Sequence, residues 1–132
     1  GGRASQLPGA TNVDIIAESG IRASATKLPF ASGSVDEIIA SNPYLDGTFN
    51  IMDWLPEAAN VLKPGGQLII NATVKNPYAK LPSAQTLESL GLRVLQEQGQ
   101  LLPQFRNQTF HITNGDPIQI EKMGSVILEK MP

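Results

Sequence analysis

Asp14 is a candidate ligand-binding residue because it ends the apolar segment Asn12-Val13-Asp14. Open α/β sheets bind their ligands just beyond the carboxyl ends of their strands. A carboxylate at such a position can accept hydrogen bonds from both hydroxyl groups of a ribose. The alternative is an ordinary aspartate at a strand end or a cap, with no ligand.

His111, the single histidine, is a candidate for acid–base chemistry. It lies close in the sequence to Arg106 and to several hydroxyl and amide side chains, a set that could cleave RNA. A lone histidine in a polar loop is more often simply solvated, so both interpretations stay open.

The composition excludes other kinds of site. The chain has no cysteine, which rules out a disulfide, a thiolate zinc site and a cysteine nucleophile. One histidine cannot build a His-rich metal site, and we expect no metal. The formal net charge is −2, which disfavours broad, non-specific binding to nucleic acid. The apolar runs are far too short to cross a membrane.

Ten prolines and twelve glycines divide the 132 residues into short segments. A helix is predicted to begin at Asp53, a suitable N-cap, with Pro56 in its first turn. Lys63-Pro64-Gly65-Gly66 should end this helix, with glycine in the left-handed conformation. A second helix is predicted over Ser83–Leu90, stopped by Gly91. Apolar, β-branched segments predict strands at 12–16, 21–25, 35–41, 67–72, 92–95 and 125–129, with a further candidate at 110–112.

Strands joined by helices imply right-handed crossovers and a mostly parallel sheet. No helix is expected between the last two strands, so one of them should be antiparallel. We therefore predict a single α/β domain over residues 1–132, with an antiparallel strand near the C-terminus.

Three sequence patterns resemble class I S-adenosylmethionine-dependent methyltransferases: Leu28-Pro29-Phe30, Ser34-Val35-Asp36, and a helix ending in Val61-Leu62-Lys63-Pro64-Gly65-Gly66. The resemblance covers about residues 1–95 and implies a Rossmann-like methyltransferase fold. Gly1 and Gly2 would be the end of the family's glycine-rich loop, which puts the first strand before residue 1 and makes the fold truncated there.

The resemblance implies S-adenosylmethionine as the cofactor. Asp14 would bind the ribose, and Ser24 stands near the point where many members carry an aspartate that binds the adenine amino group. The full set of cofactor-binding residues implied in this way is Gly1, Gly2, Asp14, Ile15, Ser24 and Ala25.

Asn42-Pro43-Tyr44 follows the predicted strand at 35–41. Amino-group methyltransferases carry Asn-Pro-Pro-Tyr at this position, where the Asn side chain and a proline carbonyl hold the target amine and the aromatic ring stacks on it. The resemblance therefore implies that Asn42, Pro43 and Tyr44 are catalytic, although this chain has one proline fewer. Asn-Pro is also a common turn opener. Tyr78 repeats the tripeptide after the 67–72 strand and could line the substrate site or be an ordinary loop aromatic.

The chain opens with Gly1-Gly2-Arg3, continues with Leu7-Pro8-Gly9-Ala10-Thr11-Asn12-Val13-Asp14-Ile15 and closes with Gly124-Ser125-Val126-Ile127-Leu128-Glu129-Lys130. With the Leu-Pro-Phe and Asn-Pro-Tyr segments, it resembles over its whole length methyltransferase-like domains at the C-termini of bacterial contact-dependent inhibition and Rhs-type polymorphic toxins. This resemblance implies secretion within a larger bacterial protein, action in the cytoplasm of a target cell, and a cognate immunity protein as partner. It implies no membrane partner, and RNA is a possible substrate. The alternatives are a toxin that cleaves RNA with the same fold, an inactive binding module, and a housekeeping methyltransferase.

Overall fold

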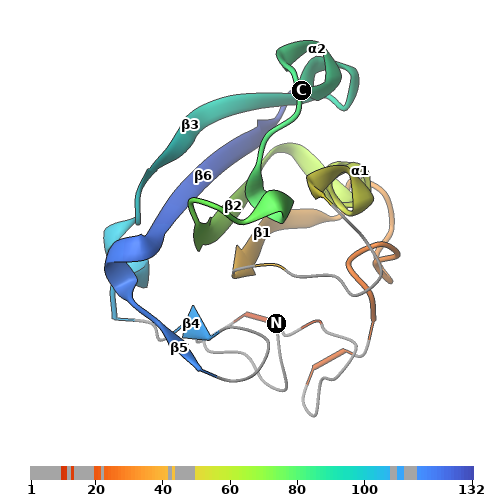
Figure 1. Ribbon diagram of the computed structural model, residues 1–132. Coiled ribbons are helices and arrows are strands. Elements are labelled where there is room, and N and C mark those ends of the chain that lie inside the picture. The colour runs from red at the N-terminus through yellow and green to blue at the C-terminus, as the bar shows by residue number, and fades with distance from the viewer. Residues whose placement is uncertain are drawn as a thin grey trace.

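The structure is a computed structural model that describes residues 10–11, 13, 20–21, 23–41, 43, 50–107, 110–111 and 116–132. In these ranges four strands form one mixed sheet in the order β1-β2-β6-β3 (Figure 1). The four strands are β1 (Val35–Ser41), β2 (Leu62–Thr73), β3 (Leu92–Gln100) and β6 (Met123–Lys130).

The strand directions confirm the predicted sheet. β1 and β2 are parallel, and β6 is antiparallel to both β2 and β3. Hence β1, β2 and β3 all run the same way, and β6 is the one reversed strand of the four. The predicted strand at 35–41 has the bounds of β1, whereas β2, β3 and β6 extend beyond the segments predicted for them.

The remaining elements are short. The helix α2 (Ala84–Ser89) begins after its N-cap Ser83 and is followed by Gly91 with φ of 73°, as predicted. A two-stranded ladder pairs β4 with β5 and confirms an extended segment at Phe110. The other short elements are η1 (Ile51–Asp53), α1 (Leu55–Val61), η2 (Pro77–Ala79), η3 (Pro103–Phe105), β4 (Phe110–His111), β5 (Pro117–Ile118) and η4 (Ile120–Lys122).

The start of the first predicted helix is corrected by the structure. Asp53 is not the N-cap of α1; its carboxylate accepts from the backbone N–H of Asn50 at 2.8 Å and closes a capping box on η1. Trp54 occupies the cap position of α1 without a side-chain hydrogen bond, and Pro56 falls within the first turn as predicted. A short 3-10 turn capped by Asn50 therefore leads into the helix, and Asp53 serves as the third residue of its capping box.

The end of that helix is also different. α1 ends at Val61, and Leu62 already pairs with Val35 of β1. The next paired residue of β2 is Gln67, so residues 63–66 form an irregularity in the ladder rather than a helix cap. Gly65 does adopt a positive φ of 81°, but within this bulge.

The sheet is covered on both faces. Alternate residues of β2 pack on one side against α1, α2 and η2, in a buried cluster that includes Trp54, Leu55, Leu68, Ile70 and Leu87. On the other side Ile69 packs with Leu101, Phe105, Phe110 and Met123. Burial on both faces explains why β2 reads as a continuous apolar run.

The first two predicted strands are only partly described. Val13 and Ile21 form a single parallel bridge, while residues 12 and 14–16 lie outside the described ranges. The segment 21–25 is not a strand throughout, because Ala25 and Thr26 form a turn. None of the described helices is both long and apolar enough to span a membrane.

Candidate functional site

The carboxyl ends of β1, β2 and β3 lie at one edge of the sheet, because these strands share one direction. Near this edge Ser41, Asn71 and Ser125 are register partners on β1, β2 and β6. The row places polar side chains where open α/β sheets bind ligands.

Pro43, which follows β1, and Asn76, which follows β2, meet at this edge. The side-chain amide of Asn76 donates to the carbonyl oxygen of Pro43 at 3.0 Å, in a half-buried contact between segments 33 residues apart. The Oδ1 atom of Asn76 accepts from the backbone N–H of Tyr78 at 2.8 Å and caps η2. One side chain thus fixes both the turn after β2 and the carbonyl that follows β1.

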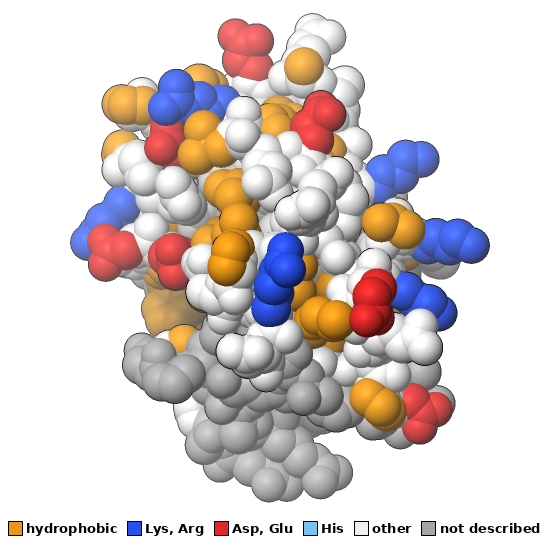
Figure 2. All heavy atoms as spheres, turned by 90° about the vertical axis from the view of Figure 1, so that its left-hand side faces the viewer, with side chains coloured by type: hydrophobic (Ala, Val, Ile, Leu, Met, Phe, Trp, Pro, Cys, Tyr) orange, Lys and Arg blue, Asp and Glu red, His pale blue; other side chains and the backbone are white. Residues whose placement is uncertain are grey.

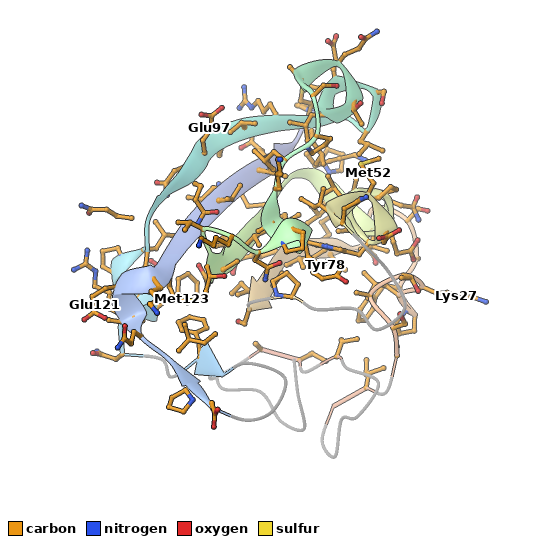
Figure 3. The ribbon with its side chains drawn as sticks, viewed as in Figure 1. Lys27, Met52, Tyr78, Glu97, Glu121 and Met123 are labelled. Carbon is orange, nitrogen blue, oxygen red and sulfur yellow. The ribbon has the colours of Figure 1, made fainter. Side chains whose placement is uncertain are left out.

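Tyr78 is a core residue rather than a residue of an open substrate site. Its side chain is only 5% exposed and belongs to the main hydrophobic cluster (Figure 3). Its carbonyl oxygen accepts from the indole N–H of Trp54 at 3.1 Å, which ties η2 to the residue that precedes α1.

Asn71 and Ser125 form a buried polar pair. Both are fully buried, and the hydroxyl of Ser125 donates to Oδ1 of Asn71 at 2.7 Å. The same hydroxyl accepts from the backbone N–H of Leu102 at 3.0 Å. The amide nitrogen of Asn71 has no hydrogen-bond partner among the residues that the structure describes, although buried donors are nearly always hydrogen-bonded.

The hydroxyl of Ser24 can still accept a hydrogen bond, as binding of an adenine amino group would require. Its hydroxyl accepts from the backbone N–H of Thr26 at 3.2 Å and shares a hydrogen bond of 2.8 Å with the Thr26 hydroxyl. A hydroxyl has two lone pairs and one proton, so Ser24 can accept one more hydrogen bond if it donates to Thr26. Ala25 contributes its methyl group to the main core cluster, so its side chain is structural.

Six of the predicted site residues lie outside the described residues: Gly1, Gly2, Asp14, Ile15, Asn42 and Tyr44. The same holds for the side chain of His111 and for the Asn114-Gly115 turn. Pro43 is therefore the one predicted catalytic residue that the described ranges contain, and Asn76 is its partner there.

A cavity of about 650 Å³ lies beside Asn76, between the segment that follows β2 and strands β3 and β6. Figure 2 shows the face that lies on the left of Figure 1, where hydrophobic side chains form a band with charged side chains around it. The lining residues are Val74, Lys75, Asn76, Pro77, Ala79, Lys80, Leu81, Glu97, Gln98 and Val126.

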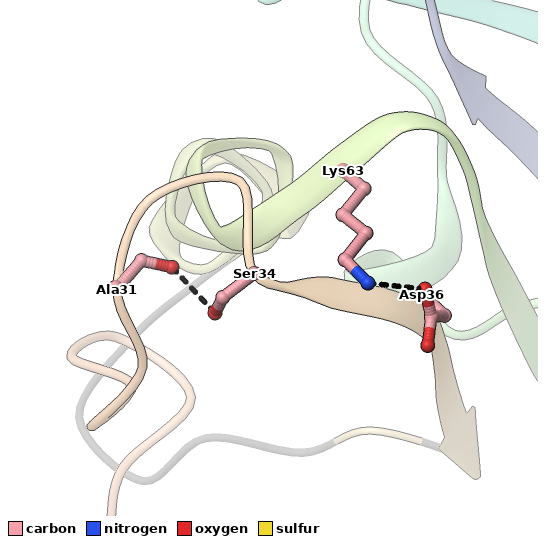
Figure 4. A network of polar contacts seen from close by, with 4 residues as sticks. All are labelled: Ala31, Ser34, Asp36 and Lys63. Carbon is pink, nitrogen blue, oxygen red and sulfur yellow. Dashed lines mark hydrogen bonds and ion pairs between the residues drawn. The ribbon is translucent and has the colours of Figure 1, made fainter.

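The Lys63–Gly66 segment lies at the opposite edge of the sheet, where β1 and β2 begin. There Lys63 pairs with Asp36 at 2.8 Å and the Ser34 hydroxyl donates to Ala31 at 2.7 Å (Figure 4). Both charged side chains are exposed, so the pair adds little stability. Across the described ranges, no three acidic or histidine side chains come together as metal ligands.

Comparison with known proteins finds a similarity to one sequence family, within the first 70 residues. Residues 6–70 match the sequence model of a family described as a methyltransferase domain, a segment that includes β1, α1 and most of β2. No curated protein matches the chain.

Two solved structures resemble the chain in fold. The 4+2 cyclase SpnF is 14% identical with a TM-score of 0.46, and the match covers 83% of this chain and 54% of that one. The YcgJ protein from Bacillus subtilis is 14% identical with a TM-score of 0.42, covering 86% of this chain and 73% of that one. The chain thus spans about half the length of SpnF. The described residues thus form a Rossmann-like α/β fold, and residues 6–70 are similar in sequence to a methyltransferase domain.

Proposed function

We propose that the chain transfers a methyl group from S-adenosylmethionine to an amino nitrogen. The observation that carries this proposal is the match of residues 6–70 to the methyltransferase domain family. The position of Pro43, just beyond β1 at the carboxyl edge of the sheet, agrees with it.

The Pro43 carbonyl is the acceptor whose surroundings are known. A carbonyl oxygen has two lone pairs, and Asn76 occupies one of them. The second can accept from one N–H of the target amine, while the Asn42 side chain would accept from the other. Two fixed acceptors orient the nitrogen lone pair and stabilise the positive charge that develops on nitrogen.

S-adenosylmethionine, when bound, would supply an electrophilic methyl group for the amine nitrogen, with the C–S electrons left on sulfur and the amine proton released to water. Ser24 would accept from the adenine amino group with its remaining lone pair. Asp14 would hold the ribose hydroxyls, and Gly1, Gly2 and Ile15 would complete the pocket.

The test measures methyl transfer and cofactor binding separately. Asn42→Ala should lower turnover by at least about 100-fold, because it removes one acceptor for the reacting amine. The matched control is Asn60→Ala, since the side chain of Asn60 accepts from the Ser32 hydroxyl at an exposed site. Full turnover by Asn42→Ala would refute the role of the tripeptide, and absence of calorimetric heat with S-adenosylmethionine would favour a non-catalytic module.

We also propose, from the resemblance of the whole sequence, that the domain is a bacterial toxin held inactive by an immunity protein. It would be delivered as part of a larger secreted protein and act in the cytoplasm of the target cell. Expression in bacteria should arrest growth, and the Asn42→Ala variant should relieve the arrest. Arrest that persists in Asn42→Ala but disappears in His111→Ala, with cleaved RNA and no cofactor required, would favour the nuclease alternative.

A further inference from the structure

We propose that the cavity beside Asn76 binds a phosphate group carried by the molecule that is methylated. The inference rests on the proposed function, because it assigns the cavity to the acceptor of the methyl group. It extends that function by naming the chemical class of the acceptor, an amine that also bears a phosphate.

The first argument is that one residue, Asn76, both lines the cavity and contacts the predicted catalytic carbonyl. Asn76 lines the cavity, and the same side chain donates to Pro43 at 3.0 Å. The cavity therefore adjoins the residue that holds the Pro43 carbonyl, and the proposal places the phosphate of the acceptor there. Glu97, Gln98 and Val126 form the opposite wall from β3 and β6.

The second argument is charge. Lys75 and Lys80 both line the cavity and are exposed, and neither makes a side-chain hydrogen bond or ion pair within the described part of the chain. Two ammonium groups match the charge of a phosphate, which is close to −2 near neutral pH. Glu97, also exposed, brings one negative charge to the opposite wall and should weaken the binding of any anion.

The third argument is the shape and polarity of the rest of the wall. Pro77, Leu81 and Val126 give the cavity an apolar surface beside its lysines. A binding site with apolar walls and a few convergent polar groups is the usual form of a small-molecule site. The volume of about 650 Å³ lies within the range of such sites.

The test compares 5′-AMP, which carries an amine and a phosphate, with adenosine, which carries the amine alone. Their affinities for the full chain are measured by titration calorimetry, with inorganic phosphate and acetate as further probes. Lys75→Glu and Lys80→Glu should each weaken 5′-AMP binding by about tenfold through loss of attraction, and leave adenosine unchanged. Lys122→Glu, the same charge change outside this cavity, should have little effect. Glu97→Gln should strengthen 5′-AMP binding a few-fold.

The outcomes separate this inference from the proposed function. If 5′-AMP binding depends on Lys75 and Lys80 but no methyl transfer occurs, the phosphate site is supported and the proposed methyltransferase activity is refuted. Methyl transfer with equal binding of 5′-AMP and adenosine, or with no effect of the lysine variants, would overturn the phosphate site alone. Acetate binding that equals phosphate binding would also overturn it, because the group recognised would then be a carboxylate.

Discussion

The side chain of Asn76 makes two hydrogen bonds through different atoms, so a substitution can remove one of them and keep the other. Its oxygen atom caps η2 by accepting from Tyr78, and its nitrogen atom donates to Pro43. Aspartate retains the first contact and loses the second, because both carboxylate oxygens only accept hydrogen bonds.

We predict that Asn76→Asp lowers the free energy of unfolding by about 1–2 kcal/mol, because the Pro43 carbonyl loses its hydrogen-bond donor. It should lower kcat/KM for methyl transfer by about tenfold or more, because the Pro43 carbonyl is no longer held in place. Urea unfolding and initial rates measure the two effects. Asn60→Asp, which keeps an acceptor for Ser32, is the control. An unchanged kcat/KM would show that the position of the carbonyl does not matter.

The second residue-scale prediction concerns Ser125. Ser125→Ala removes the acceptor for the Leu102 N–H and the donor to the buried Asn71 side chain. Because buried groups left without partners are costly, the free energy of unfolding should fall by about 2–3 kcal/mol. Ser89→Ala, whose exposed hydroxyl donates to Thr86, should change it by less than about 0.5 kcal/mol. Similar losses in both variants, measured by urea unfolding, would argue against the buried network.

At the scale of elements, the sequence predicted β1 and α2 well, because their ends are set by residues next to them in the sequence. The bounds of β1 follow from a β-branched run that ends before Asn-Pro, and those of α2 from Ser83 and Gly91. The early start of β2 was missed because Leu62 pairs with Val35, a contact that no local pattern encodes. Asp53 was misassigned because a competing cap, Asn50, stands three residues earlier.

The bulge that begins β2 supports a prediction about its glycines. A methyl group on Gly66 would lie 2.9 Å from the carbonyl oxygens of both Asp36 and Lys63, whereas one on Gly65 would meet open space. Gly65→Ala should therefore cost only the left-handed conformation, about 1 kcal/mol. Gly66→Ala should cost more than about 2 kcal/mol, because backbone must move. Urea unfolding compares the two variants, and the reverse order would contradict the geometry of the bulge.

At the scale of the whole molecule, the sheet predicts a gradient of stability. Among the described residues, β2 and β6 have a paired neighbour on each side, while β3 pairs only with β6. In hydrogen–deuterium exchange, amides of Ile69, Ile70 and Val126 should exchange at least about 100-fold more slowly than those of Glu97–Gln100, since edge segments open more readily. Equal protection of the two groups would mean that β3 has a partner on its outer side.

The candidate site was less predictable than the fold. The sequence places an Asn-Pro-Tyr tripeptide after each of two strands, but only the adjacency of β1 and β2 brings Asn76 to Pro43. Asn71 and Ser125 did carry a signal, because each is a polar residue inside an apolar strand. The phosphate-binding lysines carried none, since exposed lysines are common everywhere on protein surfaces.

The central position of β6 has a consequence for biosynthesis. β6 lies between β2 and β3 in the sheet but is synthesised after both. As the polypeptide leaves the ribosome, the backbone groups of β3 therefore stay unpaired until about twenty more residues have emerged and β6 follows. During that interval the nascent domain exposes an unpaired strand that other chains could capture. Binding by chaperones and the risk of misassembly should therefore be greatest just before Met123–Lys130 pairs with β2 and β3.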